Sequence, residues 1–147
     1  MRRLAIASFA LLCIALAIPL AIFWSHEPIP LVGTPLPPEF QPHPHGALAS
    51  STILYPTYIS PSGKYRVGVD ATNLVRLVIP TNDDFVTPDG ISMSSTLTDV
   101  RAVSQLPLNA DGNFGYTIQL SSGWTARFDS RGGPPGPDTH VASVLAR

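Results

Sequence analysis

Ser94, Ser95 and His140 are the residues of this chain whose types could support nucleophilic catalysis. A serine hydroxyl becomes a nucleophile when a neighbouring base takes its proton and an acid orients that base. Asp138, two positions before His140, is the candidate for that acid. Neither serine lies in the G-x-S-x-G frame of a strained nucleophile elbow. The alternative is that these hydroxyls, with Thr96, start a helix.

The residues after the serines have the pattern of a helix start. Thr96 is followed three positions later by Asp99, as in a capping box. The hydroxyl accepts a hydrogen bond from an unpaired N–H group, and the acid suits the positive end of the helix. Leu97, Val100 and Val103 then recur at helical spacing and predict one apolar face. We therefore favour helix capping over catalysis as the role of these hydroxyls.

The chain offers little for binding a metal ion or a cofactor. His43 and His45 have the H-x-H spacing of a metal-binding pair, but no second ligand-rich segment accompanies them. Cys13 is the single cysteine, which excludes an intrachain disulfide and a cysteine cluster. The turn at residues 109–113 does not continue into the glycine and glutamate pattern of a calcium loop. The sequence therefore predicts no metal and no cofactor.

Length and charge narrow the class of protein further. A chain of 147 residues has room for one ordinary domain. The formal net charge is −1 and Lys64 is the one lysine, which argues against a basic face for nucleic acid.

The N-terminal segment has the pattern of a transmembrane helix. Residues 4–24 carry no charge, follow Arg2 and Arg3, and end at Trp24. As a helix this segment would span about 30 Å, the thickness of the hydrocarbon core of a bilayer. The preceding positive charge predicts that residues 1–3 stay in the cytoplasm. We expect a bacterial signal anchor in the inner membrane, with the C-terminal domain in the periplasm.

A cleaved signal peptide is the competing interpretation. Its apolar region usually spans about 7–15 residues and ends at a small-x-small site. Ala15 and Ala17 lie inside the apolar run, and the bulky Trp24 occupies the wrong place beyond it. A lipoprotein would need a small residue before Cys13, where this chain has Leu12. We therefore expect an uncleaved anchor, with secretion after cleavage as the alternative.

Residues 25–46 have the composition of a Pro-rich linker. Seven prolines lie between Glu27 and His45, and proline fixes φ and removes a backbone donor. The sequence predicts an extended, semi-rigid spacer of about 3.1 Å per residue, which could hold a domain roughly 60 Å from a membrane.

Residues 47–147 predict a small α+β domain, an antiparallel β-sheet with one short helix. Residues 51–59 alternate but contain Pro56, which predicts an edge strand or an interrupted strand. Residues 64–71 and 73–80 predict the next two strands.

The second half of the domain predicts a hairpin and a closing strand. Residues 114–120 and 124–130 alternate on either side of a Ser-Ser-Gly turn. Residues 140–146 follow a Gly/Pro-rich loop and predict a strand, with a short helix as the alternative. One side of that strand would carry Val141, Ser143 and Leu145.

The segment 75–100 contains T-P-D-G-I followed by S-T-L-x-D-V. It resembles a strand–turn–helix segment of small bacterial envelope proteins. In outline it is similar to the helix-start motif of outer-membrane assembly lipoproteins and of β-lactamase-inhibitor-like modules. It departs from that pattern at Ser94, where glycine is usual. The resemblance implies a scaffold for protein contacts, with no catalytic residues to transfer.

The prediction for function is a membrane-anchored accessory or interaction module in the periplasm, without catalytic activity. Its partners would be the lipid bilayer, through residues 4–24, and an envelope protein, with no nucleic acid. Binding would use an exposed strand edge or the loops 83–90 and 131–138. One alternative is an immunity-type inhibitor of an envelope-targeted toxin. A less favoured one is a hydrolase built on His140.

Overall fold

The computed structural model describes residues 27–50, 53–112, 115–129 and 132–147, with the backbone alone for 45–50. The predicted transmembrane segment therefore lies outside the described residues. Within the described part, no helix is both long enough and apolar enough to cross a membrane.

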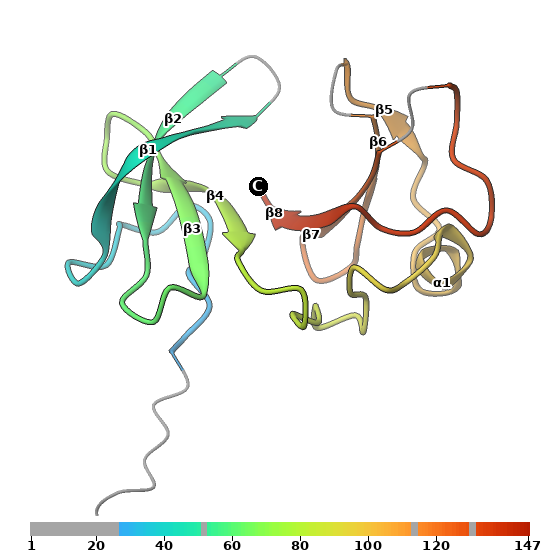
Figure 1. Ribbon diagram of the computed structural model, residues 1–147, viewed down its shortest axis with the longest axis horizontal. Coiled ribbons are helices and arrows are strands. Elements are labelled where there is room, and N and C mark those ends of the chain that lie inside the picture. Colours follow the sequence, from blue (N-terminus) through green and yellow to red (C-terminus); the bar gives the residue numbers. More distant parts are fainter. Residues whose placement is uncertain (1–26, 51–52, 113–114, 130–131) are drawn as a thin grey trace, which may run out of the picture.

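One antiparallel β-sheet of eight strands forms the body of the protein, in the order β1-β2-β3-β4-β8-β7-β6-β5 (Figure 1). The strands are β1 (Gln41–Ser50), β2 (Ile53–Ile59), β3 (Tyr65–Val69), β4 (Val75–Pro80), β5 (Asn109–Ala110), β6 (Tyr116–Gln119), β7 (Trp124–Phe128) and β8 (Ser143–Ala146). One short helix, α1 (Leu97–Val103), lies between β4 and β5 in the chain. The expected fold class, a small antiparallel sheet with one short helix, is therefore confirmed.

Strand β8 stands in the middle of this sheet although it is the last in the chain. Strands β1 to β4 form one group, and β5 to β8 form the other. The two groups meet where β8 pairs with β4, with Val78 opposite Ala146. Figure 1 shows the groups on either side of this junction, with α1 beside the second. Among the described strands, β8 therefore provides the hydrogen-bonded pairing between the two groups.

A single hydrophobic core includes residues from both groups of strands. Seven of its side chains have no exposed surface, namely Val67, Val75, Val78, Val100, Ile118, Ala126 and Phe128. Helix α1 adds Leu97 and Val100. Burial of a large apolar side chain stabilises the fold by about 1.5–3 kcal/mol. A shared core therefore holds the two groups together beyond their short strand pairing.

Phe85, in the loop after β4, reinforces the junction. Its ring meets Tyr65 of β3 edge-on, with 6.2 Å between centroids. The same ring lies tilted on Trp124 of β7, with 4.7 Å between centroids. Aromatic pairs at these separations contribute about 0.5–1.5 kcal/mol beyond the area they bury. Phe85 therefore links the first group of strands to the second.

The predicted helix start is confirmed in detail. The Thr96 hydroxyl accepts from the backbone N–H of Asp99 at 3.3 Å, and the Asp99 carboxylate accepts from the backbone N–H of Thr96 at 2.7 Å. These two bonds make a complete capping box. The helix ends at Val103, and the Ser104 hydroxyl then donates to the carbonyl of Gln119 at 2.8 Å.

The expected spacer at residues 25–46 differs from the structure in its described part. Pro30 and Phe40 are buried, and Phe40 belongs to the hydrophobic core. The backbone N–H of Gly33 donates to the carbonyl of Val75 at 2.8 Å, and that of Val75 donates to the carbonyl of Thr34 at 2.9 Å. Extended, proline-rich backbone keeps its carbonyls and some N–H groups available for such pairing. The segment is therefore part of the domain, whose described body begins at residue 27 and not at 47.

The prediction that residues 51–59 form an edge strand is wrong. Strand β1 occupies the edge, and β2 lies between β1 and β3. Pro42 and Pro44 fit this arrangement, because proline cannot donate to a ladder and is confined to edges and bulges. A register shift between Pro42 and Ala47 precedes the pairing of Ala47 with Pro56.

The hairpin predicted in the second half is confirmed as β6 and β7, which pair from Tyr116 opposite Phe128 to Gln119 opposite Thr125. The closing segment forms strand β8, which confirms a strand over a helix. Ser143 and Leu145 share one face of this strand, whereas the buried residues are Val141 and Val144. Val141 precedes the strand, so the two-residue period cannot be counted from it.

Candidate functional site

The fold brings His140 next to the serine cluster that lies more than forty residues before it in the sequence. Thr96 and His140 form an isolated antiparallel bridge. The His140 ring nitrogen Nδ1 lies 3.0 Å from the backbone carbonyl of Ser94. The backbone N–H of Val141 donates to the carbonyl of Ser95 at 2.8 Å. The predicted residues Ser94, Ser95 and His140 therefore meet on one surface.

The serine hydroxyls at this surface take part in turn contacts. The hydroxyls of Ser92 and Ser94 lie 2.8 Å apart, and the Ser95 hydroxyl accepts from the backbone N–H of Ser92 at 3.1 Å. His140 is exposed, and the partner of its Nδ1 is a carbonyl. A general base must reach the proton that it removes from the nucleophile. This geometry favours a structural role for His140, which fixes the turn before α1.

The charge of His140 affects the pKa of Asp99, an acid other than the predicted Asp138. Hydrogen bonds from the Thr96 backbone and hydroxyl hold the pKa of Asp99 below its usual value, and the charge of His140 adds to this effect. Asp138 is exposed in the loop before His140. The Asp99 carboxylate is itself committed to the capping box.

The two loops named as binding candidates are tied to the domain. The carbonyls of Thr139 and Pro137 accept the backbone N–H groups of Leu97 and Thr98, at 2.9 and 3.0 Å. These bonds pair donors that the first turn of a helix leaves free. In loop 83–90, the Asp89 carboxylate accepts from the backbone and hydroxyl of Ser122. Both loops therefore serve as structural contacts.

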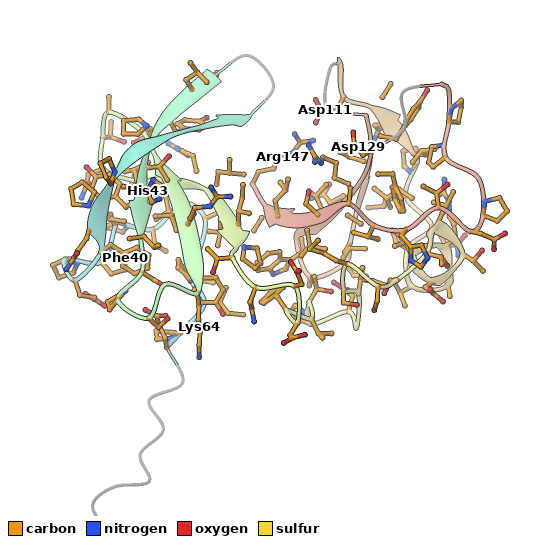
Figure 2. All side chains as sticks on the ribbon, in the orientation of Figure 1. Phe40, His43, Lys64, Asp111, Asp129 and Arg147 are labelled. Atoms are coloured by element: carbon orange, nitrogen blue, oxygen red, sulfur yellow. The ribbon has the colours of Figure 1, made fainter. Side chains whose placement is uncertain are left out.

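His43 of the predicted H-x-H pair lies in the edge strand β1 and is half-buried (Figure 2). Its Nδ1 atom is buried without a hydrogen-bond partner. The side chain of His45 lies outside the described residues. Among the described side chains, no group of three or more His, Cys, Asp or Glu residues could hold a metal.

A charged pair marks the junction end of β8. Arg147 donates from Nη1 to the Asp111 carboxylate at 2.8 Å (Figure 2). Arg147 also lines a shallow cavity of about 240 Å³ between residues 29–32 and the β6–β7 turn. Its lining also includes Trp124 and the polar residues Gln119 and Ser122.

The outer half of the β1–β2 hairpin is the most exposed apolar feature of the described chain. Strand β2 pairs with β3 only over Thr57, Tyr58 and Ile59, so residues 53–56 pair with β1 alone. Ile53 is 54% exposed and Leu54 is 68% exposed. Consecutive strand residues point to opposite faces. The hairpin therefore projects from the sheet (Figure 1), and its two exposed apolar side chains belong to opposite faces.

We name this feature, residues 53–56 with Ile53 and Leu54 exposed, the hairpin tip. The sequence held a signal for it, because Ile53 and Leu54 are adjacent apolar residues that break the alternation of a half-buried strand. By contrast, the pair of Asp111 and Arg147, 36 residues apart, carries no local pattern.

No protein-family model, no curated protein and no solved structure matches this chain. The resemblance of residues 75–100 to small envelope proteins therefore stays a prediction. The functional conclusion depends on the geometry alone.

Proposed function

We propose that this chain is a membrane-anchored accessory module that works in the periplasm without catalytic activity. Residues 4–24 would hold it in the inner membrane, and the hairpin tip would bind an envelope protein. The observation that carries the proposal is the projection of Ile53 and Leu54 into solvent, 54% and 68% exposed. A large apolar side chain on each face of a protruding ribbon costs solubility unless another surface covers it.

The chemistry of the hairpin indicates what kind of partner would cover it. Residues 46–59 contain no charged residue. Electrostatic attraction therefore contributes little, and a nucleic acid would find no phosphate contact here. The partner that fits is a folded protein with an apolar concave surface, into which Ile53 and Leu54 insert from two sides. An envelope-targeted toxin, which an immunity-type inhibitor would mask, is one protein of this kind.

The arrangement around His140 supports the noncatalytic form of the proposal over the hydrolase. Its ring nitrogen contacts the Ser94 carbonyl at 3.0 Å, on an exposed surface. The serine hydroxyls contact one another and the turn backbone.

Site-specific photocrosslinking in cells tests the proposal with a matched control. A photoreactive amino acid would replace Leu54 in the full chain, and Leu106 in the control. Both are exposed leucines, at 68% and 46%. We expect one discrete protein adduct from position 54 and none from position 106. A reporter fused after Arg147 should be active only outside the cytoplasm.

Two results would overturn this function. One is the same set of weak adducts at both positions, or adducts with lipid alone at position 54. The other is a reporter that is active in the cytosol. With the photoreactive amino acid placed at position 53 instead, Leu54→Asp should abolish the adduct. The control Leu106→Asp should leave that adduct unchanged.

A further inference from the structure

The described chain begins against the body of the domain. Glu27 accepts a hydrogen bond from the Ser60 hydroxyl at 3.1 Å and a second from the Ser62 hydroxyl. Burial raises the pKa of Tyr65, and the neighbouring charge of Glu27 raises it further. Ile29, two residues after Glu27, packs on the hydrophobic core. The residues that were expected to act as a spacer are therefore already docked at the β2–β3 turn.

This docking limits how far the domain can lie from the predicted membrane segment. The apolar run ends at Trp24, and Glu27 is the third residue after it. Three residues of fully extended chain reach about 10 Å. The headgroup region on one side of a bilayer is itself roughly 5–8 Å thick. The first docked residue can then lie at most about 2–5 Å beyond the outer surface of the headgroups.

Resting on the membrane anchoring proposed above, we infer that the domain sits directly on the lipid surface, with the β2–β3 turn at residues 60–64 facing the headgroups and the hairpin tip directed away. Pro61, Ser62 and Lys64 are exposed in this turn. Figure 2 shows Lys64 at the end of the molecule where the described chain begins.

The charges near this face favour a tethered contact over an electrostatic one. Lys64 is the single lysine of the chain, and an ammonium group next to lipid phosphates is favourable. Asp83 and Asp84 are exposed in the loop after β4, so the surface as a whole has no positive excess. The short connection to residues 4–24, and not charge, would hold the turn at the membrane.

The opposite direction of the hairpin tip follows from strand β2. Glu27 contacts Ser60, just after the end of β2, whereas Ile53 begins that strand. Seven residues of strand span about 20 Å. When β2 stands along the membrane normal, the tip lies roughly 20 Å farther from the lipid than the turn does. The surface proposed to bind an envelope protein would then be presented to the periplasm.

Quenching of a fluorophore by labelled headgroups tests this placement in the full chain. All labelled variants would carry Cys13→Ser, because Cys13 is the single cysteine of the chain and would otherwise react with the fluorophore. Lys64→Cys and Leu54→Cys would each carry the same fluorophore, in phosphatidylcholine vesicles that contain a headgroup quencher. We expect at least a threefold larger quenched fraction at position 64 than at position 54. Insertion of ten Gly/Ser residues after Ser25 should reduce quenching at position 64 to the level of position 54.

The possible outcomes separate this inference from the anchoring beneath it. Protein that floats with the vesicles but shows equal, weak quenching at both positions would refute the apposition while leaving the anchor intact. Protein that does not float would refute the anchor, and the inference with it. Unchanged circular dichroism and thermal unfolding of each labelled variant would exclude unfolding as the cause.

Discussion

Gly68 lets strand β2 pass close to β3, and replacing it with alanine should destabilise the domain. An added Cβ atom would lie 2.9 Å from the Tyr55 Cβ and 3.3 Å from the Leu77 Cβ. Both neighbours are first side-chain atoms, so they cannot rotate away and the strands themselves must move apart. Gly68 does not have a positive φ, so the effect should be steric and not a backbone preference.

The expected size of the effect follows from two opposing contributions. Forcing an extra methyl group into a packed interior costs about 1–3 kcal/mol. Replacing glycine in a strand recovers roughly 0.5–1 kcal/mol of conformational entropy. The net loss for Gly68→Ala should be about 1–2 kcal/mol, which lowers Tm by roughly 3–8 °C in a domain of this size.

Urea unfolding followed by circular dichroism measures this loss, with Gly136→Ala as the matched control. Gly136 also lacks a positive φ, and its added Cβ would meet nothing closer than the Thr139 Oγ1 at 3.9 Å. The control should differ from the wild type by less than about 0.5 kcal/mol. If Gly68→Ala were as stable as the wild type, the close approach of Tyr55 in β2 and Leu77 in β4 to Gly68 would be wrong.

Two further predictions concern the aromatic contact between the two groups of strands and the loss of folding stability at low pH. Phe85→Ala should lower the free energy of unfolding by about 3 kcal/mol, because it removes the ring that joins Tyr65 to Trp124. The control Val86→Ala, at a side chain 56% exposed, should change it by less than about 0.5 kcal/mol in the same urea assay. Equal effects of the two substitutions would contradict the role of Phe85 as a link between the strand groups. Hydrogen bonds from the Thr72 hydroxyl, Arg76 and Leu74 hold the pKa of Asp70 well below its usual value. Because that pKa is lowered in the folded state, its stabilising effect is present above the unfolded value of about 3.9 and is lost as the pH falls. The stability advantage of the wild type over Asp70→Asn should therefore narrow between pH 5 and pH 2, and a constant gap would refute this.

Local patterns in the sequence predicted the elements whose residues are close together in the chain. The capping box of Thr96 and Asp99 needs only a spacing of three, and the structure has both of its hydrogen bonds. The β6–β7 hairpin follows from alternation around a short turn. These features depend on backbone sterics and nearest neighbours, which a sequence displays directly.

Features that depend on long-range contacts were not predictable in the same way. The proline content of residues 27–44 describes backbone conformation but not what that backbone packs on, so the docking of Phe40 into the core was missed. The sequence identified His140 as the candidate base for the serines. Its partner in the structure, the Ser94 carbonyl, follows only from the fold. The position of β8 between β4 and β7 likewise has no local signature.

The central place of β8 has a consequence for how the sheet forms while the chain is being synthesised. Residues 143–146 emerge after nearly everything else, and until they arrive β4 and β7 each present an unpaired row of backbone donors and acceptors. Such rows invite pairing with other nascent chains, and the non-local closure of the sheet is slow. Synthesis would therefore give a two-part intermediate that must be kept apart from its neighbours until its final strand is available.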